Sequence, residues 1–441
     1  MYLDISDGTT TVVLSGTSPV TGCTFFPKTS QYKNGDWQPV TEDAIVNLRG
    51  THTAIRSTTN SVEGLIQAAI RRQETGVGPR VYVNYKPVDS DSSTYRSEII
   101  DGRVNWSTEP GLRRLGDTNP PAQVQIIWTR QAGWDGAEAE LSVSSNGQSA
   151  ATGGRTITNN PAGANWLQAA AAQVGGVLPT PVRIELTNST GSGQAYRKLV
   201  VNVNAYSDPA NLVYYLQGEA RISGGSTSSD ATCSGSSRLD FTATSSITTF
   251  QWTLPAADMQ RTDGRRARLV ARMNSITGIL FVRPKILDGA GNQVLWQGDE
   301  LSLGTLSDAT LWDLGIVPLP PGGYGGSYGA LRLGLDVRGA STSSLDVLQL
   351  SMIDAYRFYE LPSVSVANNA TIVLDSMEGR NYISTSGAWT PLPVAFGEPI
   401  MVQPNTLQRL HFLYEIAATN GVPITGTFSG RVYYRPRRLT V

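Results

Sequence analysis

The chain has 441 residues, of which 40% are hydrophobic and only 16% are charged, and its formal net charge is −1. A charge this close to zero excludes wholesale binding to DNA or to an anionic membrane surface, although it permits a local basic face. The sequence contains no run of about 18 apolar residues, so it predicts no membrane-spanning helix and no membrane insertion.

The composition favours a mainly β protein built from antiparallel β-sandwich domains. Charged residues fall below the share usual in soluble proteins, and Ser, Thr, Asn and Gly take their place. Short strands joined by turns use these residues, whereas helices favour Glu, Lys, Ala and Leu. At roughly 150 residues per domain, the length predicts about three domains. Cys23 and Cys233 lie far apart and predict two small buried residues, not a disulfide framework or a metal cluster.

The N-terminal part predicts strands followed by one helix. In DWQPVTEDAIVNLRG the apolar residues Ala44, Val46 and Leu48 alternate with charged or polar residues, as in a half-buried strand. The period then changes, and NSVEGLIQAAIRRQETG predicts a helix over 61–74. Asn60 has the spacing of a capping residue, and Gly76 supplies a stop. The expected buried face of this helix consists of Val62, Leu65, Ile66, Ala69 and Ile70.

The next region predicts a second helix among strands. The segment NWLQAAAAQVGG at 165–176 contains four consecutive alanines that favour a helix and two glycines that end it. Around it, segments such as RVYVNYKPV, AQVQIIWTR and TPVRIELTN show a period of two or short apolar runs, with turn residues between them.

From about 210 to 360 the strands become evenly spaced. Along ALRLGLDVRG, Leu333, Leu335 and Val337 point to one side, while Asp336 and Arg338 point to the other. Many short strands in such a length are typical of an antiparallel sandwich, and we expect a jelly roll that resembles carbohydrate-binding modules.

The last segment is again rich in strands but is too short to be stable alone. It is expected to complete a sheet begun before residue 205, and the similarity of RVYVNYKP at 80–87 to RVYYRP at 431–436 supports one shared sheet. The predicted layout has three parts: a belt-like β domain with one helix, the sandwich, and a C-terminal β segment that is a candidate to complete the first domain. Their ranges are 1–208, 209–361 and 362–441.

No catalytic, cofactor-binding or metal-binding residues are predicted. The sequence has no nucleophile elbow, phosphate-binding loop or dinucleotide fingerprint. His52 and His411 lack partners at zinc-ligand spacing and are expected on strands. Asp89 and Asp91 are compatible with calcium binding, but an acidic hairpin tip is the commoner arrangement. A pair of catalytic carboxylates, as in glycoside hydrolases, stays open because 36 Asp and Glu residues are present.

Aromatic residues of the predicted sandwich are candidate contacts to a glycan or a protein partner. Trp296 and Trp312 lie on its strands, and Tyr324 and Tyr328 lie in the loop PLPPGGYGGSYGAL. Aromatic side chains on such a surface stack on sugar rings or anchor a partner. The alternative is that the tryptophans fill the core and the tyrosines have no role.

The two ends of the chain resemble tail proteins of long-tailed bacteriophages, and the distal tail protein family in particular. The resemblance is carried by YLDISDGTTTVVL and TEDAIVNLRG near the start and by WTPLPVAFGEPIMVQPNTLQRLHFLYEI and GRVYYRPRRLTV near the end. It covers roughly 1–110 and 361–441, and 210–360 only as a type of module. The region 111–205 departs from the family because it is longer and more irregular than a simple belt needs.

The resemblance implies a structural virion protein without enzymatic activity or cofactor. Such a protein is made in the host cytoplasm, forms a homo-oligomeric ring as a hexamer or trimer, and contacts other tail proteins at the tail tip or baseplate. It connects the tail tube to host-recognition components, does not read nucleic acid, and in some versions binds a host-surface glycan. A ring needs strands that end on a neighbouring subunit. The C-terminal residues expected there are Tyr433, Tyr434, Arg435, Arg437 and Arg438.

Other functions remain open at this point. The terminal strand is equally compatible with a place in the protein's own sheet, with its arginines in solvent. The chain is also compatible with a carbohydrate-binding adhesin or tail fibre protein that acts through 209–361. A polysaccharide-degrading enzyme is the third alternative.

Overall fold

The chain forms two compact units. The computed structural model describes residues 1–16, 18–33, 36–87, 94–108, 121–163, 165–205, 213–254, 264–305, 310–320, 330–353, 356–361, 365–417 and 426–439. The first unit consists of Met1–Glu138, Gly175–Leu178 and Arg435–Val441, and the second of Ala139–Val174 and Pro179–Tyr434. The division therefore lies at Glu138 instead of near residue 208, because the strands that follow Glu138 pair with strands close to the C-terminus.

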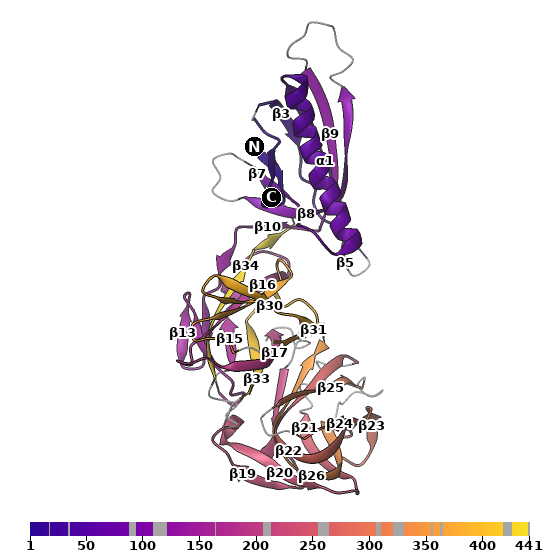
Figure 1. Cartoon of the computed structure of the whole chain (residues 1–441). Helices are drawn as coiled ribbons and strands as arrows, with labels where there is room; N and C mark the ends of the chain where they lie inside the picture. The colour runs from indigo at the N-terminus through magenta and orange to yellow at the C-terminus, as the bar shows by residue number, and fades with distance from the viewer. Residues whose placement is uncertain are drawn as a thin grey trace. The chain divides into compact units, whose positions relative to one another are not determined.

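The first unit is an antiparallel sheet covered by one helix (Figure 1). Along the sheet the strands follow the order β2 (Thr11–Val13), β1 (Tyr2–Ser6), β7 (Tyr82–Lys86), β8 (Tyr95–Thr108), β9 (Pro121–Arg130), β6 (Val40–Arg49) and β3 (Val20–Phe25). Two short strands, β10 (Trp134–Asp135) and β35 (Arg437–Arg438), pair with each other at its side, and β4 (Tyr32–Lys33) and β5 (Asp36–Trp37) form a separate hairpin. The predicted alternation along β6 is confirmed, because Ala44, Val46 and Leu48 are buried.

Helix α1 spans His52–Thr75 and begins earlier than the predicted residue 61. Thr51, not Asn60, caps its N-terminus by accepting a hydrogen bond from the Ala54 N–H (3.3 Å), so the prediction that His52 lies on a strand is wrong. Gly76 ends the helix in a left-handed conformation (φ 70°), as the sequence predicted. The helix packs along β8 (Figure 1). On its predicted apolar face, Val62, Leu65, Ile66 and Ala69 are buried and Ile70 is partly buried.

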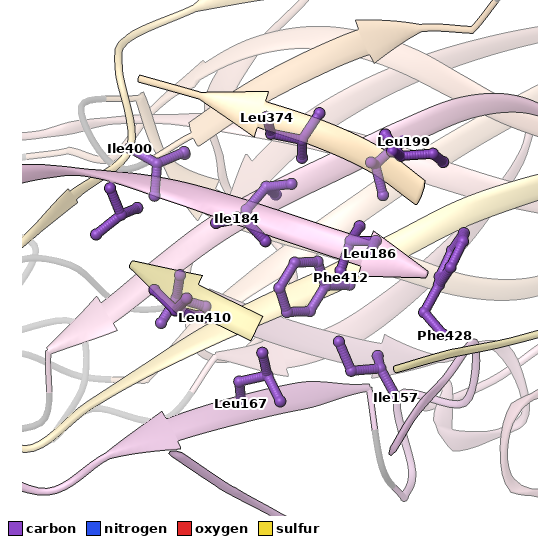
Figure 2. Close-up of a cluster of buried hydrophobic side chains, with 14 of the residues drawn as sticks. Ile157, Leu167, Ile184, Leu186, Leu199, Leu374, Ile400, Leu410, Phe412 and Phe428 are labelled. Atoms are coloured by element: carbon purple, nitrogen blue, oxygen red, sulfur yellow. The ribbon is translucent and has the colours of Figure 1, made fainter. Parts of the chain in front are cut away.

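The second unit begins with a sandwich of two antiparallel sheets, which we call the host sandwich. One sheet follows the order β11 (Ala139–Glu140), β34 (Thr427–Tyr434), β16 (Thr180–Asn188), β28 (Thr371–Asp375), β29 (Arg380–Thr385) and β30 (Ala388–Pro391), with β14 (Arg155–Thr158) and β32 (Met401–Val402) at its sides. The other follows the order β13 (Gln148–Ala151), β12 (Val143–Ser145), β15 (Trp166–Ala169), β33 (Gln408–Ala417), β17 (Ala195–Ala205), β27 (Tyr356–Glu360) and β31 (Val394–Gly397). Figure 2 shows side chains from both sheets, including Ile184, Leu199, Phe412 and Phe428, meeting in its core.

Two sequence-based expectations are wrong in this sandwich. The segment expected to form a helix over 165–176 forms strand β15 and a single 3-10 turn over Ala171–Gln173. Pairing with β33 buries Leu167 and Ala169 on one face, which outweighs the helix propensity of the alanines. The similar segments at 80–87 and 431–436 do not share a sheet, since β7 belongs to the first unit and β34 to the host sandwich.

A second sandwich, called here the inserted sandwich, occupies the sequence between β17 and β27. Its strands are β18 (Val213–Gln217), β19 (Ser226–Ser229), β20 (Ser237–Ala243), β21 (Thr248–Leu254), β22 (Arg266–Leu287), β23 (Val294–Gln297), β24 (Leu301–Leu303), β25 (Thr310–Pro318) and β26 (Leu331–Met352). Because Asn202 of β17 pairs with Tyr356 of β27, this segment leaves and re-enters the host sandwich at neighbouring points. Its identity as a jelly roll stays a prediction.

Strands β22 and β26 pair along most of their length, and the other strands of the inserted sandwich join the same sheet through them. At the middle of the pair, Gly278 and Gly339 have φ of 92° and 137°. An added Cβ would lie 2.2 Å from the Ala340 oxygen at Gly278 and 2.3 Å from the Ile279 oxygen at Gly339, so only glycine fits there. On either side of this point the two strands place Leu269, Leu350, Val282 and other apolar residues in one core. All pairs between named strands are antiparallel, and the predicted mainly β class is confirmed.

Candidate interaction surfaces

The arginines at the C-terminus find partners within the first unit. Arg435 forms an ion pair with Glu138 (3.1 Å), and Arg437 forms one with Asp135 (2.7 Å). The Arg438 guanidinium lies over the ring of Tyr95 at 5.7 Å and donates a hydrogen bond to its hydroxyl (3.3 Å). Strand β35 is thereby fixed to β10, which joins the two ends of the chain in one unit.

The tyrosines of the same segment belong to the host sandwich. Tyr434 is buried, and its hydroxyl donates to the Gln173 carbonyl oxygen (3.1 Å). The Arg183 guanidinium lies 4.4 Å from the centre of the Tyr433 ring. All five C-terminal residues expected between subunits thus have partners in their own chain, and their role between subunits stays a prediction.

Of the four aromatic residues predicted to contact a glycan, the structure describes Trp296 and Trp312. Trp296 and Trp312 are half-buried and pack against the core of the inserted sandwich, and the Lys198 ammonium lies 5.5 Å from the Trp312 ring. Tyr324 and Tyr328 lie outside the described residues. Asp89 and Asp91, the possible calcium ligands, lie outside them as well.

Phe26 is the most exposed large hydrophobic residue in the described part of the chain, with 78% of its surface accessible. Its neighbour Phe25 is buried and lies 5.3 Å, between ring centres, from both Tyr85 and Trp128. The sequence-based predictions did not single out Phe26, which directly follows strand β3, although adjacent residues of an extended segment point to opposite sides. The loop therefore holds one ring in the core and the other in solvent.

A buried ion pair fixes the loop that follows Phe26. The Arg130 and Glu42 side chains are fully buried and 2.9 Å apart. Glu42 also accepts from the Lys28 N–H (2.7 Å), while Arg130 donates to the Lys28 carbonyl oxygen (2.7 Å). Two residues further on, the Ser30 hydroxyl accepts from the Gly133 N–H (2.9 Å). Two of these bonds tie the backbone of Lys28 to the buried ion pair, and a third holds the Ser30 side chain, so the loop is fixed at both residues.

A hollow of about 670 Å³ lies beside this loop. Its lining combines polar side chains with the apolar surface of a proline and a valine, and it comprises Lys28, Thr29, Gln31, Gln38, Pro39, Val40 and Thr41. Together with Phe26 it gives the first unit both an apolar projection and a recess, which are the elements of a contact between proteins. We call Phe26 and this hollow the Phe26 surface.

A second exposed aromatic residue lies on the host sandwich. Trp389, on the hairpin formed by β29 and β30, is 67% exposed, and its ring centre lies 5.6 Å from that of Tyr382 at an angle of 58°. Ser386 and Gly387 form the turn with positive φ values of 49° and 88°. The segment SGAWT carried a turn signal that the sequence analysis did not use.

One face of the inserted sandwich carries a row of paired polar side chains. Arg332 donates to Gln251 Oε1 (2.8 Å), and Lys285 lies 2.6 Å from Asp336. Further along, Arg338 donates to Glu300 (2.8 Å), which lowers the pKa of that carboxyl group. The Arg338 guanidinium also lies 4.7 Å from the centre of the Phe281 ring. Such a face, with hydrogen-bonding groups beside an aromatic ring, suits a polar ligand.

Two other carboxylates lie deep in the second unit. Asp346 accepts from Arg272 (2.6 Å) and from the Ser234 N–H (2.8 Å), and burial raises the pKa of its carboxyl group. Burial likewise raises the pKa of Glu415, which accepts from the Leu311 N–H (3.1 Å) and lies 3.6 Å from the Lys198 ammonium. The sequence analysis did not single out either residue. Both side chains are buried among their partners.

Within the described ranges, no group of three or more His, Cys, Asp or Glu side chains is placed to hold a metal ion. A search of the same residues for a helix long and apolar enough to cross a membrane found none. Cys233 is buried as predicted, whereas Cys23 is half-buried.

Comparison with known proteins gives distant likenesses only. No protein-family model matches the chain, and no curated protein matches it. Among solved structures, the SPP1 Dit protein, titled a paradigm of the hub adsorption apparatus in phages infecting Gram-positive hosts, has 8% identity over 99% of both chains and a TM-score of 0.32. The enzymatically active domain of tailspike protein 4 from bacteriophage CBA120 has 14% identity over 33% of this chain and 19% of its own, with a TM-score of 0.20. Isomalto-dextranase from Arthrobacter globiformis T6 has 10% identity over 68% of this chain and 42% of its own, with a TM-score of 0.20. These scores are too low to establish a shared fold, so the likenesses carry no argument about this protein.

Proposed function

We propose that this chain is a structural subunit of a phage tail tip or baseplate, where copies of it form a hexameric or trimeric ring. In this role it contacts other tail proteins and connects the tail tube to host-recognition components. The proposal assigns no catalytic role and no cofactor to the chain.

The observation that carries the proposal is which parts of the chain form the first unit. The N-terminal segments that resemble distal tail proteins lie in the first unit, which also contains the last seven residues of the C-terminal resemblance, Arg435–Val441, while the rest of that resemblance lies in the second unit. The first unit is a β-sheet with one long helix, the arrangement that the resemblance implies for a belt domain.

The Phe26 surface supports a ring contact in the same unit. A ring is a closed set of heterologous contacts, so each subunit needs a projection and a recess. A rigid loop presents Phe26 at little further entropic cost on binding, because its backbone is already fixed by Arg130 and Glu42. Aromatic anchors of this kind commonly dominate the binding free energy of an interface.

Labelling and sedimentation together test the proposal. We expect an antibody against this chain to mark one end of the tail in electron micrographs of the phage, and the purified chain to sediment as a hexamer or trimer at micromolar concentration. A chain that sediments as a monomer and is missing from purified virions would contradict the structural role.

We also propose a second function, binding of a surface glycan by the inserted sandwich. Its support is the row of polar side chains around Arg332, Asp336 and Arg338 with the Phe281 ring beside it. A glycan array probed with wild-type protein and with Arg332→Ala tests this function. We expect binding to a subset of glycans and its loss in the variant, and equal or no binding by both proteins would count against it.

A further inference from the structure

The host and inserted sandwiches of the second unit meet face to face. On the host side, Leu410 and Phe412 of β33 point into the host core, so His411 and Leu413 point the other way. On the inserted side, Leu348 and Leu350 of β26 point into its own core, so Val347 and Gln349 point toward the host. Part of this junction is apolar, with the buried residues Val200, Val270, Leu311, Val347, Tyr356, Phe358 and Leu413 in contact.

The other part of the junction is polar, and several of its buried side-chain atoms have no hydrogen-bond partner in the described protein. His411 and Asn202 are Cα partners on neighbouring strands and are 6% and 0% exposed. Neither ring nitrogen of His411 and neither amide atom of Asn202 has a hydrogen-bond partner there. Burial lowers the pKa of His411 to about 3, so its neutral ring brings one donor and one acceptor.

The facing strands add more such atoms. Gln349 Oε1 and Ser351 Oγ on β26 are buried without a partner, as are Tyr356 Oη on β27 and Asn165 Oδ1. The Tyr215 hydroxyl connects the two sides, since it accepts from Asn165 (2.9 Å) and from Gln349 (3.0 Å). The Tyr215 ring centre lies 5.6 Å from that of His411, which places Asn165 and Gln349 near His411 at the junction.

We propose that this part of the junction binds a cluster of ordered water molecules. Folded proteins pair the large majority of their buried polar atoms, so a concentration of unpaired atoms in one layer needs a common ligand. The groups include both donors and acceptors, and none of them carries a charge. The buried charges nearby have ionic partners, Arg272 in Asp346 and Lys198 in Glu415, and Arg272 Nη2 adds one more buried donor without a partner. Water fits because each molecule donates and accepts, typically with about three polar neighbours.

A hydrated junction makes the inserted sandwich a docked module instead of an extension of the host core. Interfaces between separate proteins commonly contain bridging water next to apolar contacts. Two direct hydrogen bonds act with the water cluster to set the orientation of the inserted sandwich on the host: the Leu311 N–H donates to Glu415, and Lys198 donates to the Leu311 carbonyl oxygen. This inference is independent of the proposed role in a phage tail.

The sign of a stability change tests the inference in the full-length chain. The two test variants are His411→Leu and Asn202→Leu, which remove the polar side-chain atoms and add none. If water fills the junction, either variant leaves water molecules and their other partners unpaired, and we expect the melting temperature of the second unit to fall by several degrees. If the junction is dry, removing unpaired polar atoms raises the melting temperature. Asn188→Leu is the control. The Asn188 amide donates to the carbonyl oxygens of Ser192, Val366 and Ala367, so its loss lowers the melting temperature whether the junction is wet or dry.

A high-resolution map of the wild-type chain provides the second measurement. We expect ordered solvent peaks within hydrogen-bond distance of His411 and Asn202. Both results are required: a rise in melting temperature in either Leu variant, or a map without such peaks, overturns the inference.

Discussion

Arg130 and Glu42 illustrate how much depends on single residues in the first unit. Their ion pair is fully buried, and it holds the loop next to Phe26 through the backbone of Lys28. Arg130 also lies 4.4 Å from the Trp134 ring, so its charge contacts a carboxylate, carbonyl oxygens and an aromatic face. Removing one partner of a buried pair leaves an uncompensated charge, which is more harmful than removing both.

We therefore expect Glu42→Gln to destabilise the first unit by about 3–5 kcal/mol, because Arg130 loses its carboxylate. Thermal denaturation followed by circular dichroism measures the effect. Asp43→Asn is the matched control, since Asp43 is largely solvated and lies 3.9 Å from Lys28, a surface pair expected to contribute at most about 1 kcal/mol. Equal melting temperatures for the two variants would contradict a structural role for the buried pair.

Phe26 is expected to affect assembly without affecting the fold. Phe26→Asp places a charge at the proposed contact between subunits, so the oligomer is expected to dissociate at lower protein concentration. Because the side chain is exposed, stability should change by no more than about 0.5 kcal/mol. Val77→Asp is the control, as Val77 is 73% exposed in the same unit. Sedimentation velocity distinguishes the two, and a Phe26→Asp variant that assembles like Val77→Asp removes Phe26 from the interface.

His411 gives the second unit a pH dependence of known sign. Burial lowers its pKa from 6.5 to about 3, so between these values the unfolded chain binds a proton that the folded chain does not. The free energy of unfolding of the second unit is therefore highest above pH 6.5. It falls as the pH drops from 6.5 toward 3, by up to about 1.4 kcal/mol per pH unit. Denaturant titrations at pH 7 and pH 4.5 for wild type and His411→Phe measure the difference. The variant is expected to lose less stability on acidification, and equal losses would show that His411 titrates normally.

At the scale of elements, α1 shows why a helix face could be predicted but its start could not. The apolar spacing from Val62 onward is plain in the sequence, whereas the turns before it are polar and reveal their helical state only through the Thr51 cap. The helix packs on β8, and the burial of Ile55 and Thr59 in these early turns stabilises them.

Leu65→Ala is expected to destabilise the first unit by about 2–5 kcal/mol, because it opens a cavity between α1 and the sheet. Gln67→Ala is the matched control, as Gln67 is exposed on the opposite side of the helix. Urea denaturation of both variants provides the measurement. If the two unfold at the same urea concentration, α1 does not contribute to the core.

At the scale of the whole molecule, the order of strands along the chain differs from their order in space. Residues on both sides of the inserted sandwich complete the host sandwich, and both ends of the chain complete the first unit. Asn202 pairs with Tyr356 across the insertion, so the two cut points are already adjacent. Insertions are tolerated at such positions because the host strands pair whether or not the insertion is present.

Replacing residues 213–352 by a short Gly-Ser linker is expected to leave assembly intact, because the proposed ring contact lies in the first unit. The shortened chain also carries Phe358→Ser and Leu413→Ser. Both residues are buried in the junction, so removing the inserted sandwich exposes them, and the serines keep this face of the host sandwich soluble. The same two substitutions in the full-length chain are the control. Sedimentation of the shortened chain tests the expectation, and a monomer would show that assembly depends on the inserted sandwich.

The sequence by itself determined the mainly β class, the alternation along β6 and β26, the buried face of α1 and its stop at Gly76. Each of these follows from a period of two or 3.6 residues or from a local turn residue, so neighbours along the chain suffice to specify it. The regular strand spacing of the inserted sandwich is a signal of the same local kind.

Only the tertiary structure decided the division at Glu138, the strand at Trp166–Ala169 and the separation of β7 from β34. Strand partners such as β16 and β34 are distant in sequence, and local propensity does not encode which of two similar strands pairs with which sheet. The same holds for the Phe26 surface and for the junction around His411. Exposure and unpaired polar atoms depend on which residues from elsewhere in the chain cover a side chain, and that is fixed only when the sheets pack.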